Sequence, residues 1–173
     1  MKQFRFFSLL LLVLAVLSAA PGFAQDQKAP PASPAATATG KIGKATVTVA
    51  YSSPSVKGRP VWGQLVPYNE VWRAGANEAT TFTTDQPLQV EGKTLPAGTY
   101  SLFAIPTEKE WTVIFNKTAK QWGAYKYDAK QDALRVSVTP KKAAAPTEKL
   151  LYDVTPKGLV LRWENLEIPV AIK

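Results

Sequence analysis

The sequence contains no cysteine and no histidine among its 173 residues. Without cysteine the chain has no disulfide, thiolate nucleophile, thiolate zinc site or iron–sulfur site. Without histidine it lacks a Ser-His-Asp or Cys-His catalytic unit and an imidazole metal ligand. Glycine-rich phosphate loops and carboxylate-rich calcium loops are also missing. We therefore expect no cofactor and no metal site, and the main enzymatic chemistry left open relies on carboxylates.

The first 24 residues match a secretory signal peptide. Lys2 and Arg5 precede an apolar stretch at residues 6–17, which is too short to span a bilayer. Small residues follow, so we predict cleavage after Ala24; the alternative is an uncleaved N-terminal anchor. No cysteine follows the stretch, which excludes a lipoprotein. The mature chain is expected to be exported, periplasmic or secreted, without stable membrane insertion.

Basic residues outnumber acidic ones by 21 to 13, a formal net charge of +8. Removing the signal removes two basic residues and no acidic one, so the net charge falls to +6. The lysines are scattered, and no basic run alternates with aromatic residues. This pattern indicates a solvated surface and predicts no nucleic-acid partner.

Composition divides the rest of the chain into two parts. Residues 25–43 are rich in Pro, Ala and Thr, with almost no large apolar side chain, which predicts a disordered leader. Residues 44–173 alternate apolar and polar positions and are expected to form a single β domain. Nine strands are predicted, at residues 44–51, 80–84, 87–91, 99–105, 111–116, 133–138, 149–154, 159–164 and 166–172. Such a series favours an antiparallel β-sandwich or jelly-roll-like domain.

Several segments suggest where these strands lie and turn. Residues 99–105 are apolar on both faces, which predicts a central strand. Gly92-Lys93 and Pro156-Lys157-Gly158 are expected to form tight turns. Residues 139–147, which combine Pro, Lys and Ala, are interpreted as a surface loop.

Residues 52–79 form a long connection with no clear strand or helix period, although they are rich in aromatic residues. Long connections in compact domains are typically functional or disordered, and the large side chains argue against disorder. A second loop, residues 116–128, is also aromatic, and the two loops are expected to share a surface if they converge at one end of the sandwich. Aromatic rings beside guanidinium, amide and carboxylate groups suit a sugar ring or a carboxylate. The candidate ligand-binding residues are Arg59, Trp62, Tyr68, Trp72, Arg73, Asn77, Glu78, Trp122 and Tyr125.

The same residues also fit a structural scaffold or a hydrolase. A packed loop needs large side chains, so the tryptophans can simply anchor it, and the domain is then a scaffold. A carboxylate-dependent, glycosidase-like hydrolase is a further alternative. It would use Glu78 with Asp128 or Glu70 as a second carboxylate.

Several strings in the two loops and between them resemble one family of exported bacterial proteins. They include WGQLVPY at residues 62–68, WRAGANEAT at 72–80, LPAGTYSLF at 95–103 and WTVIFN at 111–116. These strings resemble the family catalogued as domain of unknown function 2911, and they occur in the same order as in that family. Asn69 stands where the family pattern has glycine. The resemblance implies an exported, mostly β domain and assigns no activity.

The sequence thus favours a non-catalytic binding module of the cell envelope. Its expected partner is a glycan, a peptidoglycan fragment or an envelope protein, held by the aromatic and polar residues of the two loops.

Overall fold

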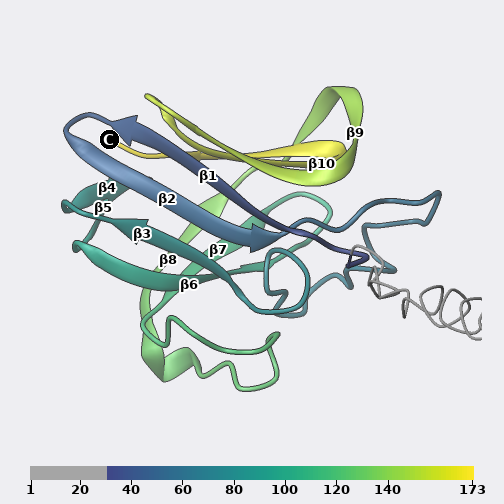
Figure 1. Cartoon of the computed structure of the whole chain (residues 1–173), viewed down its shortest axis with the longest axis horizontal. Helices are drawn as coiled ribbons and strands as arrows, with labels where there is room; N and C mark the ends of the chain where they lie inside the picture. The colour runs from purple at the N-terminus through teal and green to yellow at the C-terminus, as the bar shows by residue number, and fades with distance from the viewer. Residues whose placement is uncertain (1–30) are drawn as a thin grey trace, which may run out of the picture. The chain divides into compact units, whose positions relative to one another are not determined.

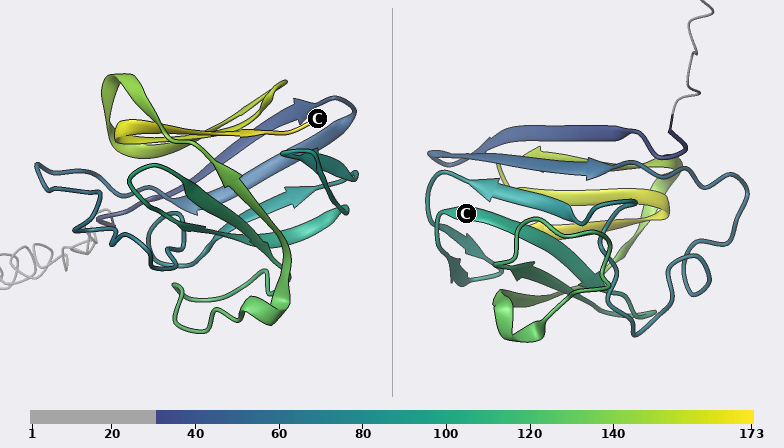
Figure 2. Two further views of the ribbon diagram at one scale, coloured as in Figure 1. Left: turned by 180° about the vertical axis from the view of Figure 1, so that it is seen from behind. Right: turned by 60° about the horizontal axis from the view of Figure 1, so that its bottom comes forward.

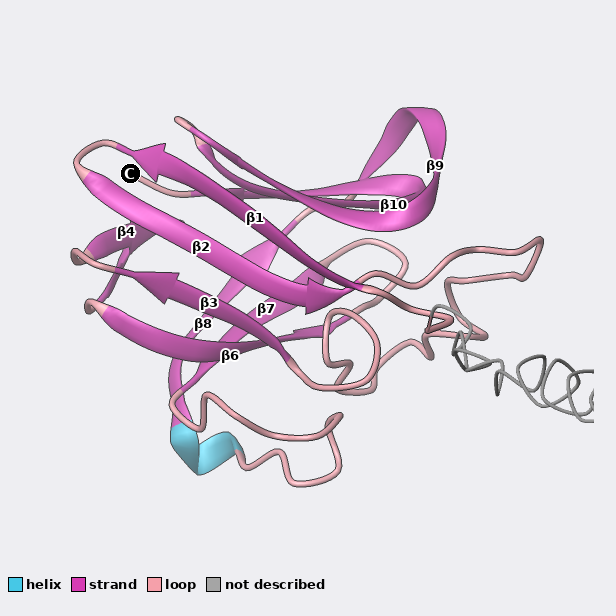
Figure 3. Ribbon diagram, in the orientation of Figure 1, coloured by secondary structure: helices cyan, strands magenta, loops and turns pink. Residues whose placement is uncertain are grey.

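The described part of the chain is built almost entirely from antiparallel strands. The structure is a computed structural model that describes residues 31–173, and the predicted signal peptide lies outside those residues. The ten strands are β1 (Ala35–Ile42), β2 (Ala45–Ser52), β3 (Thr80–Thr84), β4 (Leu88–Val90), β5 (Lys93–Leu95), β6 (Gly98–Ile105), β7 (Trp111–Asn116), β8 (Asp132–Val138), β9 (Lys141–Thr155) and β10 (Gly158–Ala171). Within residues 31–173 the one helical element is a single 3-10 turn, η1 (Ala129–Gln131), shown in cyan in Figure 3. No helix in this part of the chain is long and apolar enough to cross a membrane.

Six strands form one open sheet in the order β1-β2-β3-β6-β7-β8. The long β9–β10 hairpin lies over one face of this sheet, and the short β4–β5 hairpin sits at one end (Figures 1 and 2). The mainly β, antiparallel prediction is therefore confirmed, with ten strands instead of nine and a sheet that does not close into a barrel. The predicted strands at 159–164 and 166–172 are one strand, β10, with register shifts around Glu164.

The main core lies between the sheet and the β9–β10 hairpin. Alternate residues of the sheet point inward, so Val47, Val49 and Phe82 are fully buried. Leu150 and Trp163 reach the same cluster from the hairpin. Burial of these apolar faces against each other supplies the main driving force for the fold, because the chain has no disulfide.

Strand β6 is buried on both faces, as its sequence predicts. Leu102 faces the main core, whereas the next residue, Phe103, faces the opposite side of the sheet. There Phe103 joins Ile114 of β7 in a second, smaller cluster. Tyr127, from the loop between β7 and β8, packs against that cluster. The loop at residues 117–131 is thus attached to the outer face of the sheet by an apolar contact.

The prediction of a disordered leader at residues 25–43 is wrong for residues 35–42, which form β1 and pair with β2 along its whole length. Small residues mark this strand because it lies close to β9. A β-carbon added at Gly40 would come within 2.8 Å of the Val154 carbonyl oxygen. Low apolar bulk, which suggested disorder, is here a requirement of close packing between strands. The folded domain therefore begins before the predicted boundary at Lys44.

The surface loop predicted at residues 139–147 is also wrong over most of its length. Residues 141–147 belong to β9 and pair irregularly with β10, where Thr147 lies opposite Glu164 and Lys142 opposite Leu166. Pro146 falls within this irregular stretch, where the ladder tolerates a missing N–H donor. Both predicted tight turns are present: β4 connects to β5 through Glu91-Gly92, and β9 connects to β10 through Pro156-Lys157.

Candidate functional site

The two aromatic loops meet at one short stretch of backbone pairing. Glu78 and Trp122 form an isolated antiparallel bridge, with Ala79 N–H donating to the Gln121 carbonyl at 3.0 Å. The Gly123 N–H donates to the Asn77 carbonyl at 3.1 Å. The expected convergence of residues 52–79 and 116–128 is therefore present, and it places Glu78 beside Trp122.

A groove lies beside the Glu78–Trp122 bridge, next to strands β1, β2 and β3 of the sheet. We call it the Trp122 groove; its volume is about 520 Å³. Its walls are small side chains on the strands and longer ones on the loops. The lining residues are Ala35, Ala36, Thr37, Ala50, Tyr51, Ser52, Glu78, Ala79, Thr81, Ala119, Lys120, Gln121 and Trp122. Trp122, with 61% of its surface exposed, is one of the few large apolar side chains that reach solvent in residues 31–173.

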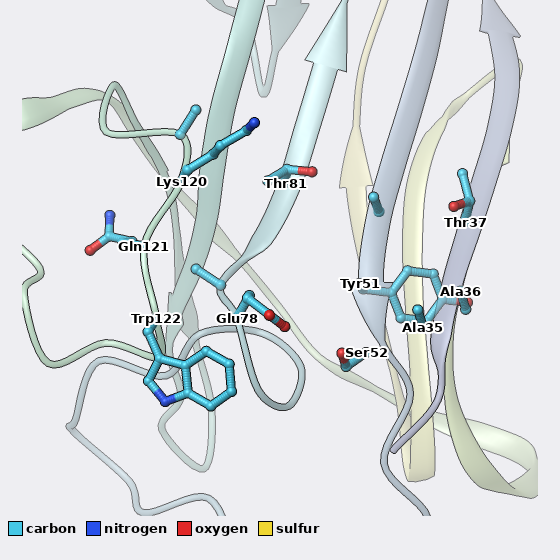
Figure 4. A pocket seen from close by; sticks show the side chains of 13 residues that line it. Ala35, Ala36, Thr37, Tyr51, Ser52, Glu78, Thr81, Lys120, Gln121 and Trp122 are labelled. Carbon is cyan, nitrogen blue, oxygen red and sulfur yellow. The ribbon is translucent and has the colours of Figure 1, made fainter. Parts of the chain in front are cut away.

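The side chains of the groove are arranged around an open centre (Figure 4). The Trp122 ring and the Glu78 carboxylate lie on one side, whereas the Tyr51 ring points away from them and packs against Tyr152 of the core. The Thr81 hydroxyl points inward from β3. An aromatic face, a carboxylate acceptor and hydroxyl groups thus surround one space, a combination suited to a ligand that is apolar on one face and hydroxylated at its edge.

The loop at residues 117–131 is held by polar side chains that are buried in the sheet. Asn116, which is fully buried, donates from Nδ2 to the Asp128 carbonyl at 2.9 Å, and its Oδ1 accepts the Thr118 N–H at 3.0 Å. Ser101 donates to the Thr118 carbonyl at 2.9 Å and accepts from Gln121 Nε2 at 3.2 Å. These bonds satisfy buried polar groups and fix the backbone that leads to Trp122.

A charged cluster anchors the far end of the same loop. Asp132, with its side chain only 8% exposed, accepts from Asn116 at 2.8 Å, from the Tyr127 hydroxyl at 2.7 Å and from Arg135 Nε at 2.6 Å. Burial, reinforced by the hydrogen bond and the negative charge of Asp132, raises the pKa of Tyr127 to about 12. Tyr127 therefore remains a neutral donor to Asp132 across the physiological pH range.

Trp62 and Trp72 do not line this groove but contribute to core packing. Together with Trp111 and Trp163 they form one cluster, in which Trp62 meets each of the other three rings edge to face. Trp72 is 8% exposed and donates its indole N–H to the Gly75 carbonyl at 3.2 Å. Core packing therefore accounts fully for Trp72, and in large part for Trp62, which is half-buried.

Arg59, Tyr68 and Asn77 lie apart from one another. Arg59 folds back on its own turn, donating to the carbonyls of Ser55 and Val56. Tyr68 packs its ring against Gly63, whose φ of +82° and missing side chain allow this contact. Asn77 is half-buried, and its amide donates to the Ser33 carbonyl and to the Ser52 hydroxyl, both at 3.2 Å. These contacts give the three residues structural roles.

Arg73 and Tyr125 line a second, smaller pocket of about 330 Å³, which we call the Arg73 pocket. Tyr125 is 86% exposed, and Leu65, at 41%, lies in the same pocket. Of the nine predicted residues, the structure thus places Glu78 and Trp122 together at the groove, and Trp72, Arg73 and Tyr125 together at this pocket.

The three carboxylates of the hydrolase alternative occupy different places in the structure. Glu78 is exposed, and no other carboxylate lines the Trp122 groove. Asp128 instead caps η1 by accepting the Lys130 N–H at 2.9 Å, and Glu70 lines the separate Arg73 pocket. Within residues 31–173 no three carboxylates are grouped as metal ligands. General acid catalysis favours a buried carboxyl, whereas Glu78 is exposed.

Sequence reasoning missed the residues that build the groove around Trp122. Tyr51, Thr81, Lys120 and Gln121 were not candidates, because residues of separate strands and loops come together only in the folded sheet. Two positions did carry a usable signal. Ser101 and Asn116 are polar residues within otherwise apolar strands, and a buried polar residue in such a place indicates a loop bonded to the strand.

The whole folded region matches one family model. The match covers residues 33–172, and the model is described as a protein of unknown function, DUF2911. The chain belongs to the DUF2911 family. Membership confirms the resemblance carried by the loop strings, and the match of this DUF2911 chain includes β1, in agreement with the structure. Asn69, where the resemblance implies a glycine, has a φ of +63°, a left-handed conformation that asparagine tolerates. No curated protein and no solved structure matches the chain significantly.

Proposed function

We propose that this DUF2911 domain is a non-catalytic binding module of the cell envelope that holds a saccharide in the Trp122 groove. The observation that carries the proposal is the exposure of Trp122, 61% of whose surface is open to solvent although its backbone is tied to Glu78. A tryptophan on a fixed backbone has only two side-chain torsions, so it loses little conformational entropy when its ring stacks on a ligand.

The chemistry of the groove supports a saccharide over a wholly apolar ligand. The carboxylate of Glu78 accepts hydrogen bonds from hydroxyl groups, and Thr81 both donates and accepts. Small residues such as Ala50 and Ala79 leave room between the strands and the loop. The volume of about 520 Å³ lies within the range of small-molecule sites.

The test is titration of the domain with neutral chito-oligosaccharides, followed by tryptophan fluorescence and calorimetry. Because Trp122 is the exposed tryptophan, covering it should shift the emission to shorter wavelength. Trp122→Ala is expected to weaken binding about tenfold or more, since stacking aromatics dominate such sites. Trp122→Phe should retain part of the affinity.

Tyr68→Ala is the matched control, because it removes an aromatic ring outside the groove. It should leave the affinity unchanged. The proposal is wrong if no neutral saccharide gives saturable binding, or if Trp122→Ala binds as well as the unaltered domain while remaining folded.

A protein partner in the envelope is the second candidate. It is favoured by the three exposed large apolar side chains of residues 31–173, Leu65, Trp122 and Tyr125, which all lie on the two aromatic loops. Leu65→Ala separates the candidates, because Leu65 does not line the Trp122 groove. It should weaken a protein contact and leave neutral saccharide binding intact.

A further inference from the structure

Arg73 differs from the other arginines in residues 31–173. Arg135 pairs with Asp132, Arg162 pairs with two carboxylates, and Arg59 donates to backbone carbonyls. The Arg73 guanidinium makes no hydrogen bond and no ion pair within residues 31–173, and its Nε atom is buried without an acceptor. The terminal N–H groups of this guanidinium are likewise unpaired but are not among the buried atoms, so a ligand in the pocket that Arg73 lines can supply their acceptor.

The backbone directs Arg73 toward the aromatic loops. Trp72 bridges to Ala104 of β6 and places its ring in the main core. Its neighbour Val71 packs on the opposite side, against the outer cluster of Phe103. Because side chains alternate along an extended segment, Arg73 falls on the side of Val71. This is the face of the sheet that the loop at residues 117–131 covers.

The Arg73 pocket combines this cation with apolar surface. Leu65 and the highly exposed Tyr125 line it, and Glu70 lies in it without pairing with Arg73. A guanidinium fork beside apolar side chains is suited to a carboxylate attached to a bulky body. Phosphate is a less suitable ligand, because the Glu70 carboxylate opposes its larger charge.

The two pockets lie on one stretch of chain. Trp122 lines the groove and Tyr125 lines the Arg73 pocket, and these residues are three positions apart, at most about 10 Å of backbone. We infer that the ligand is an acidic saccharide, with a ring on Trp122 and a carboxylate bound by Arg73. This inference rests on the proposed saccharide function and specifies the class of saccharide.

The experiment compares one ligand with and without its charge. The probes are the disaccharide of N-acetylglucosamine and N-acetylmuramic acid, and the methyl ester of the same disaccharide. The domain should bind the acid about tenfold more tightly than the ester, because the ester cannot form a charge-assisted hydrogen bond with Arg73. Arg73→Gln should abolish this preference without changing the affinity for the ester. Glu70→Gln, which removes the opposing charge, should increase the preference.

Arg59→Gln is the matched control, because it removes the same charge from a turn outside both pockets. It should keep the preference. Equal binding of acid and ester would overturn the inference while leaving the saccharide proposal intact, whereas binding of neither probe would overturn both. Loss of the preference in Arg59→Gln or Lys120→Gln, with Arg73→Gln unaffected, would assign the carboxylate elsewhere and also overturn the inference.

Discussion

Two loops carry most of the aromatic residues that the sequence singles out, and they use them in opposite ways. Residues 53–79 place Trp62 and Trp72 in a cluster with two core tryptophans. Residues 117–131 leave Trp122 and Tyr125 exposed to solvent. The loops touch each other, so the contrast does not come from their position in the fold.

The difference lies in how each loop is anchored. The longer loop buries the rings of Trp62 and Trp72 in the core as part of its anchor, so those rings are not free for a ligand. The shorter loop is held by polar bonds from Asn116, Ser101 and Asp132, with Tyr127 as its main apolar anchor. Its remaining aromatic residues are therefore available for binding. An aromatic residue in a loop is a candidate for function only when other groups carry the packing.

The largest predicted effect concerns stability, and it tests the packing role assigned to the longer loop. Trp72→Ala removes a ring that is 8% exposed, and it should lower the free energy of unfolding by about 3–5 kcal/mol. Trp122→Ala should change it by less than about 0.5 kcal/mol. Urea unfolding of both variants measures the difference. Similar losses from the two substitutions would contradict the division of roles.

The next effect concerns the anchor of the shorter loop. Asp132→Ala leaves Arg135, Tyr127 and Asn116 without their shared acceptor, and it should cost about 2 kcal/mol. Amide hydrogen exchange should accelerate across residues 117–131, and saccharide affinity should fall even though no groove residue is changed. Asp128→Ala, which removes only the cap of η1, is the control and should have a smaller effect. Unchanged exchange in Asp132→Ala would show that the apolar contacts alone hold the loop.

The smallest effect appears at high pH. Because burial and Asp132 raise the pKa of Tyr127 from 10.0 to about 12, the fold favours the neutral phenol. That contribution is complete below pH 10 and is lost as the pH rises from 10 to about 12. Burial also raises the pKa of Tyr100 and Tyr152, so these residues share the loss. Tyr127→Phe should make the fall in unfolding free energy shallower between pH 9 and 12 in urea titrations. An identical slope would show that Tyr127 does not contribute.

Local patterns in the sequence predict much of the sheet, because alternation and turn residues act over short distances. The central position of β6 follows from its two apolar faces, and the β9–β10 turn follows from Pro156-Lys157. The sequence does not predict the strand at 35–42 or the first part of β9, residues 141–147, because their residues look unsuited to a core. Gly40 is required by the approach of β9, a contact between segments that are distant in sequence.

The candidate site could be predicted only in part, because local patterns do not show which distant residues meet. Trp122 and Glu78 are conspicuous in the sequence, and they do meet in the structure. The burial of Trp72 depends on Trp111 and Trp163, whose positions only the folded sheet defines. The groove itself needs Ala50 and Thr81 from separate strands, and no local pattern joins them to the loops.

The packing of β1 against β9 also makes the fold depend on contacts between distant parts of the chain. Gly40 rests on Val154, and Val90 of β4 bridges to Ile172, so segments near both limits of the domain complete one core. Such long-range pairing slows folding. A chain that has been synthesised only as far as residue 140 lacks the β9–β10 hairpin and exposes the apolar face of its sheet. Until the hairpin is added, that face is exposed to aggregation.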